Sequence, residues 1–161
     1  PNLAPLSTGQ CATLACLLEV AAPKPGNVHR AADFEDIVLA DFLRSAVLIA
    51  PAMEAAVSRP LGQTVLQAVQ ATRQGVGKNT NLGTILLLAP LATIPREKPL
   101  GAGVAEVLRQ LGPQDAADVY QAIRLAHPAG LGKVDRYDLV DKPPEDLIAA
   151  MAAGVSALFA G

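Results

Sequence analysis

The residues best suited to chemistry lie in one glycine-rich stretch, QGVGKNTNLGT, at positions 74–84. Backbone N–H groups at a helix start, with a lysine nearby, suit the oxygens of a phosphate. The stretch is not a Walker A loop, because no Ser or Thr follows Lys78 directly. Alternatively, it is only a glycine C-cap followed by an asparagine N-cap. The candidate substrate- or phosphate-binding residues here are Lys78, Asn79, Thr80, Asn81 and Gly83.

The charges around this stretch favour an anion. No acidic residue occurs between Glu54 and Glu97, whereas three arginines and Lys78 fall in that window. A locally positive segment around a glycine-rich turn attracts negative charge. The alternative is that these cations are scattered and solvated.

A second basic corner, KPGNVHR, occupies residues 24–30. Arginine can hold a phosphate through two hydrogen bonds, lysine acts as a point charge, and histidine can donate to a phosphate or exchange a proton. The alternative is a Pro-Gly helix stop with a solvated histidine. The candidate residues at this corner are Lys24, Gly26, His29 and Arg30.

Two carboxylates complete the candidate set. Asp36 belongs to an acidic cluster with Asp33 and Glu35. It could hold Mg²⁺ carrying a nucleotide, because Mg²⁺ commonly uses one or two carboxylates together with phosphates and waters. Glu19 lies near the end of an expected helix, among alanines that let another helix approach closely. The alternatives are compensation of a helix dipole by the acidic cluster and simple exposure of Glu19.

Helix signals surround these candidates. Ser7 and Gln10 predict a capping box that opens a helix to about Ala22. Asp33 predicts the cap of a second helix, which Pro51 kinks or splits. Pro60 suits the first turn of a third helix. Expected core residues of the second and third helices are Phe34, Ile37, Val38, Phe42, Val47, Leu48, Leu61, Val65, Leu66 and Val69.

The second half of the chain also predicts helices. The run 82–94 is apolar nearly all round, which is typical of a central helix. Further helices are expected over about 104–111, from Pro113 onward, and over about 145–159, with an irregular segment at 127–144. We predict an all-α fold, a compact multi-helix bundle with a central apolar helix, with residues 1–161 in a single domain.

Composition excludes several function classes. Of 161 residues, 51% are hydrophobic and 3% aromatic, and the net charge is −2. We therefore expect neither nucleic acid nor membrane as a partner. Cys11 and Cys16 fall on different helix faces, and no signal pattern is seen, so a reduced, cytoplasmic setting is expected. An exposed apolar face on so alanine-rich a chain favours a homodimer.

Three ordered motifs resemble the ATP:dephospho-CoA triphosphoribosyltransferase family, or 2'-(5''-triphosphoribosyl)-3'-dephospho-CoA synthases. They are EV…PKPG from Glu19, an Asp at 36 followed by FLRS at 42–45, and NTNLGTI at 79–85. The similarity spans roughly residues 10–145. It implies an all-α transferase in which a hydroxyl of dephospho-CoA displaces adenine from the ribose of ATP, with the triphosphate carried along and Mg²⁺ required.

The resemblance also implies residue roles. Glu19 and Asp36 would act as catalytic carboxylates or Mg²⁺ ligands. Lys24, Arg30 and Lys78 would contact phosphates, and Asn79 and Thr80 the ribose or a phosphate.

Departures from the family pattern keep other interpretations open. The family's motif carries a His-Lys pair where Asn81 and Leu82 stand, and a His where Phe34 stands. These changes place the chain nearer a divergent NTNLG-type sub-branch, and its length suggests a shortened family domain. The alternatives are a catalytically inactive helical protein that binds a nucleotide or phosphometabolite, and a purely structural bundle.

Overall fold

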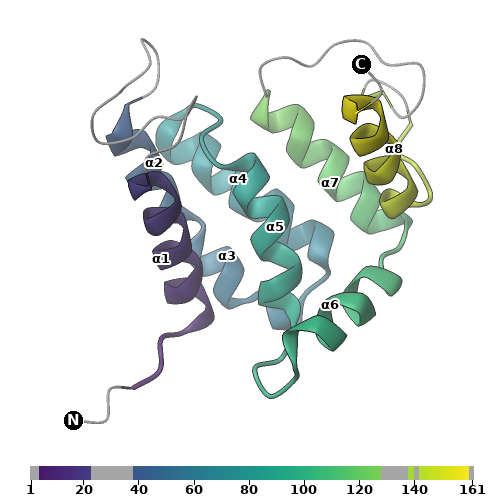
Figure 1. Cartoon of the computed structure of the whole chain (residues 1–161). Coiled ribbons are helices and arrows are strands. Elements are labelled where there is room, and N and C mark those ends of the chain that lie inside the picture. The colour runs from purple at the N-terminus through teal and green to yellow at the C-terminus, as the bar shows by residue number, and fades with distance from the viewer. Residues whose placement is uncertain (1–3, 23–37, 128–137, 140–141, 160–161) are drawn as a thin grey trace.

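The computed structural model describes residues 4–22, 38–127, 138–139 and 142–159, and in them it shows helices and no strand, as predicted (Figure 1). The helices, in chain order, are α1 (Thr8–Ala21), α2 (Leu39–Leu48), α3 (Ala50–Glu54), the 3₁₀ turn η1 (Ala56–Ser58), α4 (Leu61–Val76), α5 (Leu82–Thr93), α6 (Leu100–Arg109), α7 (Pro113–Ala126) and α8 (Leu147–Phe159).

Helices α4 and α5 occupy the middle of the bundle. Helix α4 packs most extensively on α7 and also contacts α2, α3 and α5. Helix α5 contacts α1, α3, η1, α4 and α6, which confirms the predicted central apolar helix. Its enclosure is incomplete, because Leu87 is 74% exposed. The turn between α4 and α5 therefore joins two helices that are each held in place by contacts with several other helices.

Alanines dominate the core and keep the helices close together. The largest fully buried side chains include Ile49, Met53 and Ile85. Close approach is clearest where α4 meets α7, since a Cβ added to Gly62 would lie 2.7 Å from the Cα of Asp115. The core alanines are Ala12, Ala46, Ala52, Ala56, Ala68, Ala89, Ala92, Ala116, Ala122 and Ala126.

Most predicted helix boundaries are confirmed. The capping box of α1 is present: Ser7 N donates to Gln10 Oε1 at 2.8 Å and Gln10 N to Ser7 Oγ at 3.3 Å. The helix around Pro51 is split, with α2 ending at Leu48 and α3 starting one residue before the proline. Pro113 is the first residue of α7. Capping and proline signals therefore suffice for these ends.

Two expectations are wrong. Helix α6 begins at Leu100 and not near Val104. Gly103 lies inside the helix, where it packs against Ile94: a Cβ on Gly103 would come 2.5 Å from Ile94 Cγ2. Val47, expected in the core, is 61% exposed. Small residues, Ser45 and Ala46, take the inner face of α2 instead.

Other expectations on this part of the chain have mixed outcomes. Val38 is 40% exposed, and the predicted cap Asp33 lies outside the described residues together with Phe34 and Ile37. On α1, Cys11 is exposed and Cys16 buried, as different faces require. Over the described ranges, no helix has both the length and the apolar character that a membrane span needs.

Candidate functional site

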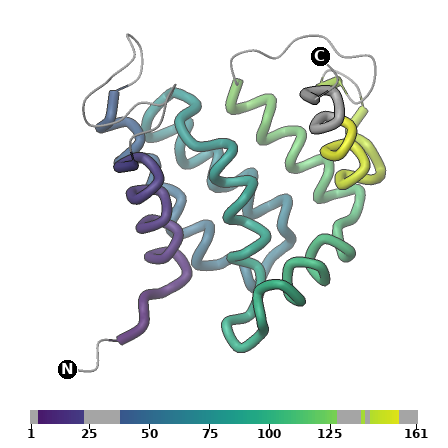
Figure 2. Tube along the Cα trace, viewed as in Figure 1, coloured from purple at the N-terminus to yellow at the C-terminus, as the bar shows by residue number. Residues whose placement is uncertain are grey.

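One end of the bundle collects five helix termini (Figure 1; Figure 2). The C-terminal ends of α1, α4 and α7 lie there, with the N-terminal ends of α2 and α5. The turn at 77–81 joins α4 to α5 at this end. Gly77 ends α4 in the left-handed region, with φ 79°, and its N–H donates to Arg73 O at 2.9 Å. The predicted glycine C-cap is confirmed.

Helix α2 holds this turn through two side chains. Lys78 Nζ lies 2.9 Å from Asp41 Oδ2, and the hydroxyls of Thr80 and Ser45 are hydrogen-bonded. Ser45 is fully buried and donates to Asp41 O at 2.8 Å, so Thr80 donates to Ser45. Asp41 and Ser45 are four residues apart and share one face of α2. The turn is therefore fixed from the side as well as at its ends.

The two asparagines of the turn have different structural roles. Leu82 N donates to Asn79 Oδ1 at 3.3 Å, so Asn79 caps the start of α5. Asn81 occupies the N-cap position but makes no capping bond. Its Oδ1 instead accepts from Thr72 Oγ1 on α4 at 3.2 Å, and its side chain is buried. Helix capping therefore explains why position 79 is an asparagine, but it does not explain why the Asn81 side chain is buried.

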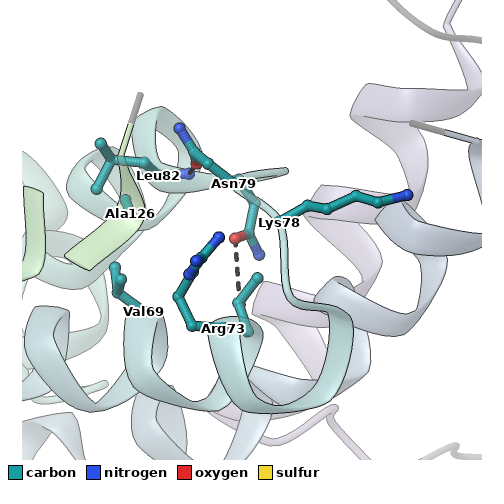
Figure 3. A pocket seen from close by; sticks show the side chains of 8 residues that line it. Val69, Arg73, Lys78, Asn79, Leu82 and Ala126 are labelled. Atoms are coloured by element: carbon teal, nitrogen blue, oxygen red, sulfur yellow. Dashed lines mark hydrogen bonds between the residues drawn. The ribbon is translucent and has the colours of Figure 1, made fainter. Parts of the chain in front are cut away.

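A shallow, partly open hollow lies in the corner between α4, the turn and α5 (Figure 3). None of its lining residues is acidic, which favours an anionic group. The lining residues are Val69, Thr72, Arg73, Lys78, Asn79, Asn81, Leu82 and Ala126.

The ion pair beside the hollow perturbs the titration of Asp41. The hydrogen bond from Lys78 is the main cause that lowers the pKa of this carboxyl, and the Val38 N–H and the charge of Arg44 lower it further. The Asp41 side chain is 17% exposed and that of Lys78 42%. The pair therefore draws the end of the Lys78 side chain toward α2 and away from the hollow (Figure 3).

We expect Asp41→Asn to lower the free energy of unfolding by up to about 1 kcal/mol at pH 7. A lowered pKa gives stability that is present above the unfolded value of about 3.9 and is lost as pH falls through the folded value. The difference between wild type and variant should therefore be smaller at about pH 3 than at pH 7. Asparagine still accepts from the Val38 N–H, so the comparison isolates the charge. Urea unfolding at both pH values measures it, and an equal difference at both would contradict it.

The structure brings some of the predicted residues together. Lys78, Asn79, Thr80 and Asn81 share the turn, and Gly83 follows in the first turn of α5, with open space where a Cβ would lie. Glu19 is half-buried in the last turn of α1 at the same end of the bundle. The remaining candidates lie outside the described residues, so their place in the site stays a prediction: Lys24, Gly26, His29, Arg30 and Asp36.

The sequence did not predict the residues that hold the turn, namely Asp41, Ser45, Thr72 and Arg73, although Ser45 belongs to the FLRS motif and Arg73 to the basic window. Asp41 and Ser45 lie at helical spacing in the stretch DFLRSA, but nothing in that spacing indicates contact with a turn about 35 residues later. The available signal was Ser45, a polar residue at a position of the helix that faces the core, because a buried hydroxyl needs a hydrogen-bond partner.

The described residues contain no group of three or more His, Cys, Asp or Glu that could hold a metal. Of the two carboxylates predicted to hold an ion, Glu19 lies in the described chain and Asp36 outside it. An ion that is carried by phosphates needs only one or two protein carboxylates, so a larger cluster is not required. Magnesium therefore stays a prediction.

Helices throughout the described chain define an all-α protein, and a lysine, two asparagines and a threonine lie at the start of one of them, α5. The family model CitG, ATP:dephospho-CoA triphosphoribosyl transferase, matches residues 5–156, and the chain belongs to this family. The family consists of transferases that use ATP and dephospho-CoA, so the resemblance seen in the sequence motifs is confirmed. Neither a curated protein nor a solved structure matches the chain.

Proposed function

We propose that this protein moves the triphosphoribosyl group of ATP to a hydroxyl acceptor such as dephospho-CoA and releases adenine. Membership of the family supports the reaction. The observation that carries the proposal for this chain is the placement of its motif residues. Lys78, Asn79, Thr80 and Asn81 converge at the start of α5, beside a hollow with no acidic lining.

The start of α5 would receive the triphosphate. A helix N-terminus offers unpaired N–H groups and a partial positive charge to phosphate oxygens. Lys78 would exchange Asp41 on α2 for a phosphate oxygen at the start of α5. The open space at Gly83 leaves room for an oxygen to approach the backbone. These groups act by positioning and by electrostatic stabilisation.

The chemical step exchanges one bond at the ribose anomeric carbon. The bond to adenine breaks and its electron pair leaves with adenine, which takes up one proton, while the acceptor oxygen forms the new bond and loses one. The acceptor proton passes to a base, and positive charge that develops on the ribose needs a nearby carboxylate. We assign these tasks to Glu19 and Asp36, with Lys24, Gly26, His29 and Arg30 as the second, basic wall. Mg²⁺, held by the same carboxylates, would neutralise triphosphate charge.

The test is an assay for free adenine with ATP, Mg²⁺ and dephospho-CoA, read by chromatography, with mass spectrometry of the acceptor. We expect one adenine for each acceptor that gains a triphosphoribosyl group, and none when the acceptor is omitted. Formation of ADP or AMP instead would contradict the proposal. Binding of ATP without adenine release would support the alternative of an inactive nucleotide-binding protein, which the Asn81-Leu82 pair in the motif favours.

A further inference from the structure

The amide nitrogen of Asn81 is a buried donor without an acceptor. Its atom Nδ2 has no hydrogen-bond partner among the described residues, and the side chain is only 9% exposed. The other end of the amide is fixed, because Oδ1 accepts from Thr72. Buried donors are nearly always paired in folded proteins, since an unmade bond is costly. The unpaired N–H therefore points to a group that binds in the hollow.

A second donor faces the same hollow. Arg73 lines the hollow together with Asn81, whereas Lys78 extends away toward α2 (Figure 3). Within the described residues the Arg73 guanidinium makes one hydrogen bond, from Nη1 to Gly77 O at 2.6 Å. A guanidinium has five N–H donors, so most of them are still available.

We propose that this hollow is a subsite for one phosphoryl group, bound by Asn81 Nδ2 and the Arg73 guanidinium. It rests on the proposed function only in naming the triphosphate of ATP as the source of that group. Two donors in a hollow that has no acidic lining residue fit an anion with several oxygens better than a neutral base. The aliphatic walls of Val69 and Ala126 strengthen the interaction by excluding water.

Titration calorimetry with inorganic triphosphate, at low salt, tests the subsite. The variant Asn81→Asp keeps the acceptor for Thr72 but replaces the free N–H by a negatively charged oxygen. The variant Arg73→Gln removes the guanidinium from a half-buried position. We expect each to weaken binding of inorganic triphosphate by about ten- to a hundred-fold, the range for a hydrogen bond to a charged group.

The matched control is Gln74→Glu. Gln74 is exposed, follows Arg73 directly and does not line the hollow, so it adds the same charge outside the subsite. Its effect should stay within about two-fold, because an exposed charge is screened by water. Thermal unfolding of each variant shows whether it is folded. If Asn81→Asp is not folded, triphosphate binding by Arg73→Gln alone tests the subsite.

Three results with inorganic triphosphate would overturn the subsite. They are undiminished triphosphate binding in both variants, an equal loss in Gln74→Glu, and no binding of inorganic triphosphate by the wild type at millimolar concentration. A loss of adenosine binding in the two variants, with triphosphate binding unchanged, would also overturn it, since that assigns the hollow to the base. Triphosphate binding that depends on Asn81 and Arg73, without any release of adenine, would uphold the subsite while the proposed transfer fails.

Discussion

Replacing Glu19 by glutamine is expected to lower the rate of adenine release by about a hundred- to ten-thousand-fold, the usual contribution of a positioned acid or base. Glu19 is half-buried in the last turn of α1, at the end of the bundle that carries the turn at 77–81. Glutamine keeps the size and the polarity and removes the negative charge. The loss should therefore appear in kcat measured with saturating ATP and acceptor.

The position of Glu19 is unfavourable for a purely structural carboxylate. An acidic residue in the last turn of a helix is opposed by the helix dipole. Its charge also reaches the inner face of α1: burial first, and then the charge of Glu19, raise the pKa of the Cys16 thiol to about 11. Charged residues at positions where they lower stability are common in active sites, because activity and not stability keeps them there. We therefore expect Glu19→Gln to lower activity far more than it lowers Tm.

Glu97→Gln is the matched control for Glu19→Gln. Glu97 is exposed in the link between α5 and α6, at the other end of the bundle. Its replacement should change neither kcat nor Tm. Full activity in Glu19→Gln would remove Glu19 from the mechanism, and a large drop in its Tm would assign the residue to the fold.

Replacing Ile85 by alanine is expected to lower the free energy of unfolding by about 3 kcal/mol, within the range for deleting a buried aliphatic side chain. Ile85 is fully buried in the core, and its N–H makes the first helical hydrogen bond of α5, to Asn81 O at 2.9 Å. The core cluster to which Ile85 belongs is rich in alanines, which have little side chain to move into a cavity. Urea unfolding followed by circular dichroism measures the loss.

Leu87→Ala provides the comparison on the same helix. Leu87 is 74% exposed, so its replacement should change the free energy of unfolding by no more than about 0.5 kcal/mol. Equal losses at the two positions would show that the outer face of α5 is covered in solution. That outcome would indicate a second copy or another partner on this face, as the predicted homodimer requires.

Local signals in the sequence were enough for most of the fold. The Ser7 capping box, the split at Pro51 and the start at Pro113 depend on groups within a few residues of the helix end. The start of α6 was missed because Gly103 resembles a helix breaker, although its lack of a side chain serves packing against Ile94. That contact joins separate segments and leaves no trace in local composition.

The candidate site was predictable only through the turn itself. Lys78, Asn79 and Thr80 are neighbours in sequence, and their types alone indicate an anion site. Their partners Asp41 and Ser45 become recognisable only once α2 packs beside the turn, because hydroxyl and carboxylate groups on a helix have many other uses. Tertiary packing therefore had to supply the second half of the site.

The contact of α2 with the turn has a consequence for evolution. Lys78 and Thr80 each meet a residue more than thirty positions earlier, in one ion pair and one hydroxyl pair. A change on one side leaves a buried or half-buried polar group without its complement, so compensating changes should accumulate at 41 with 78 and at 45 with 80. Homologues should then show these as two covarying pairs, inherited together whatever becomes of the loops between them.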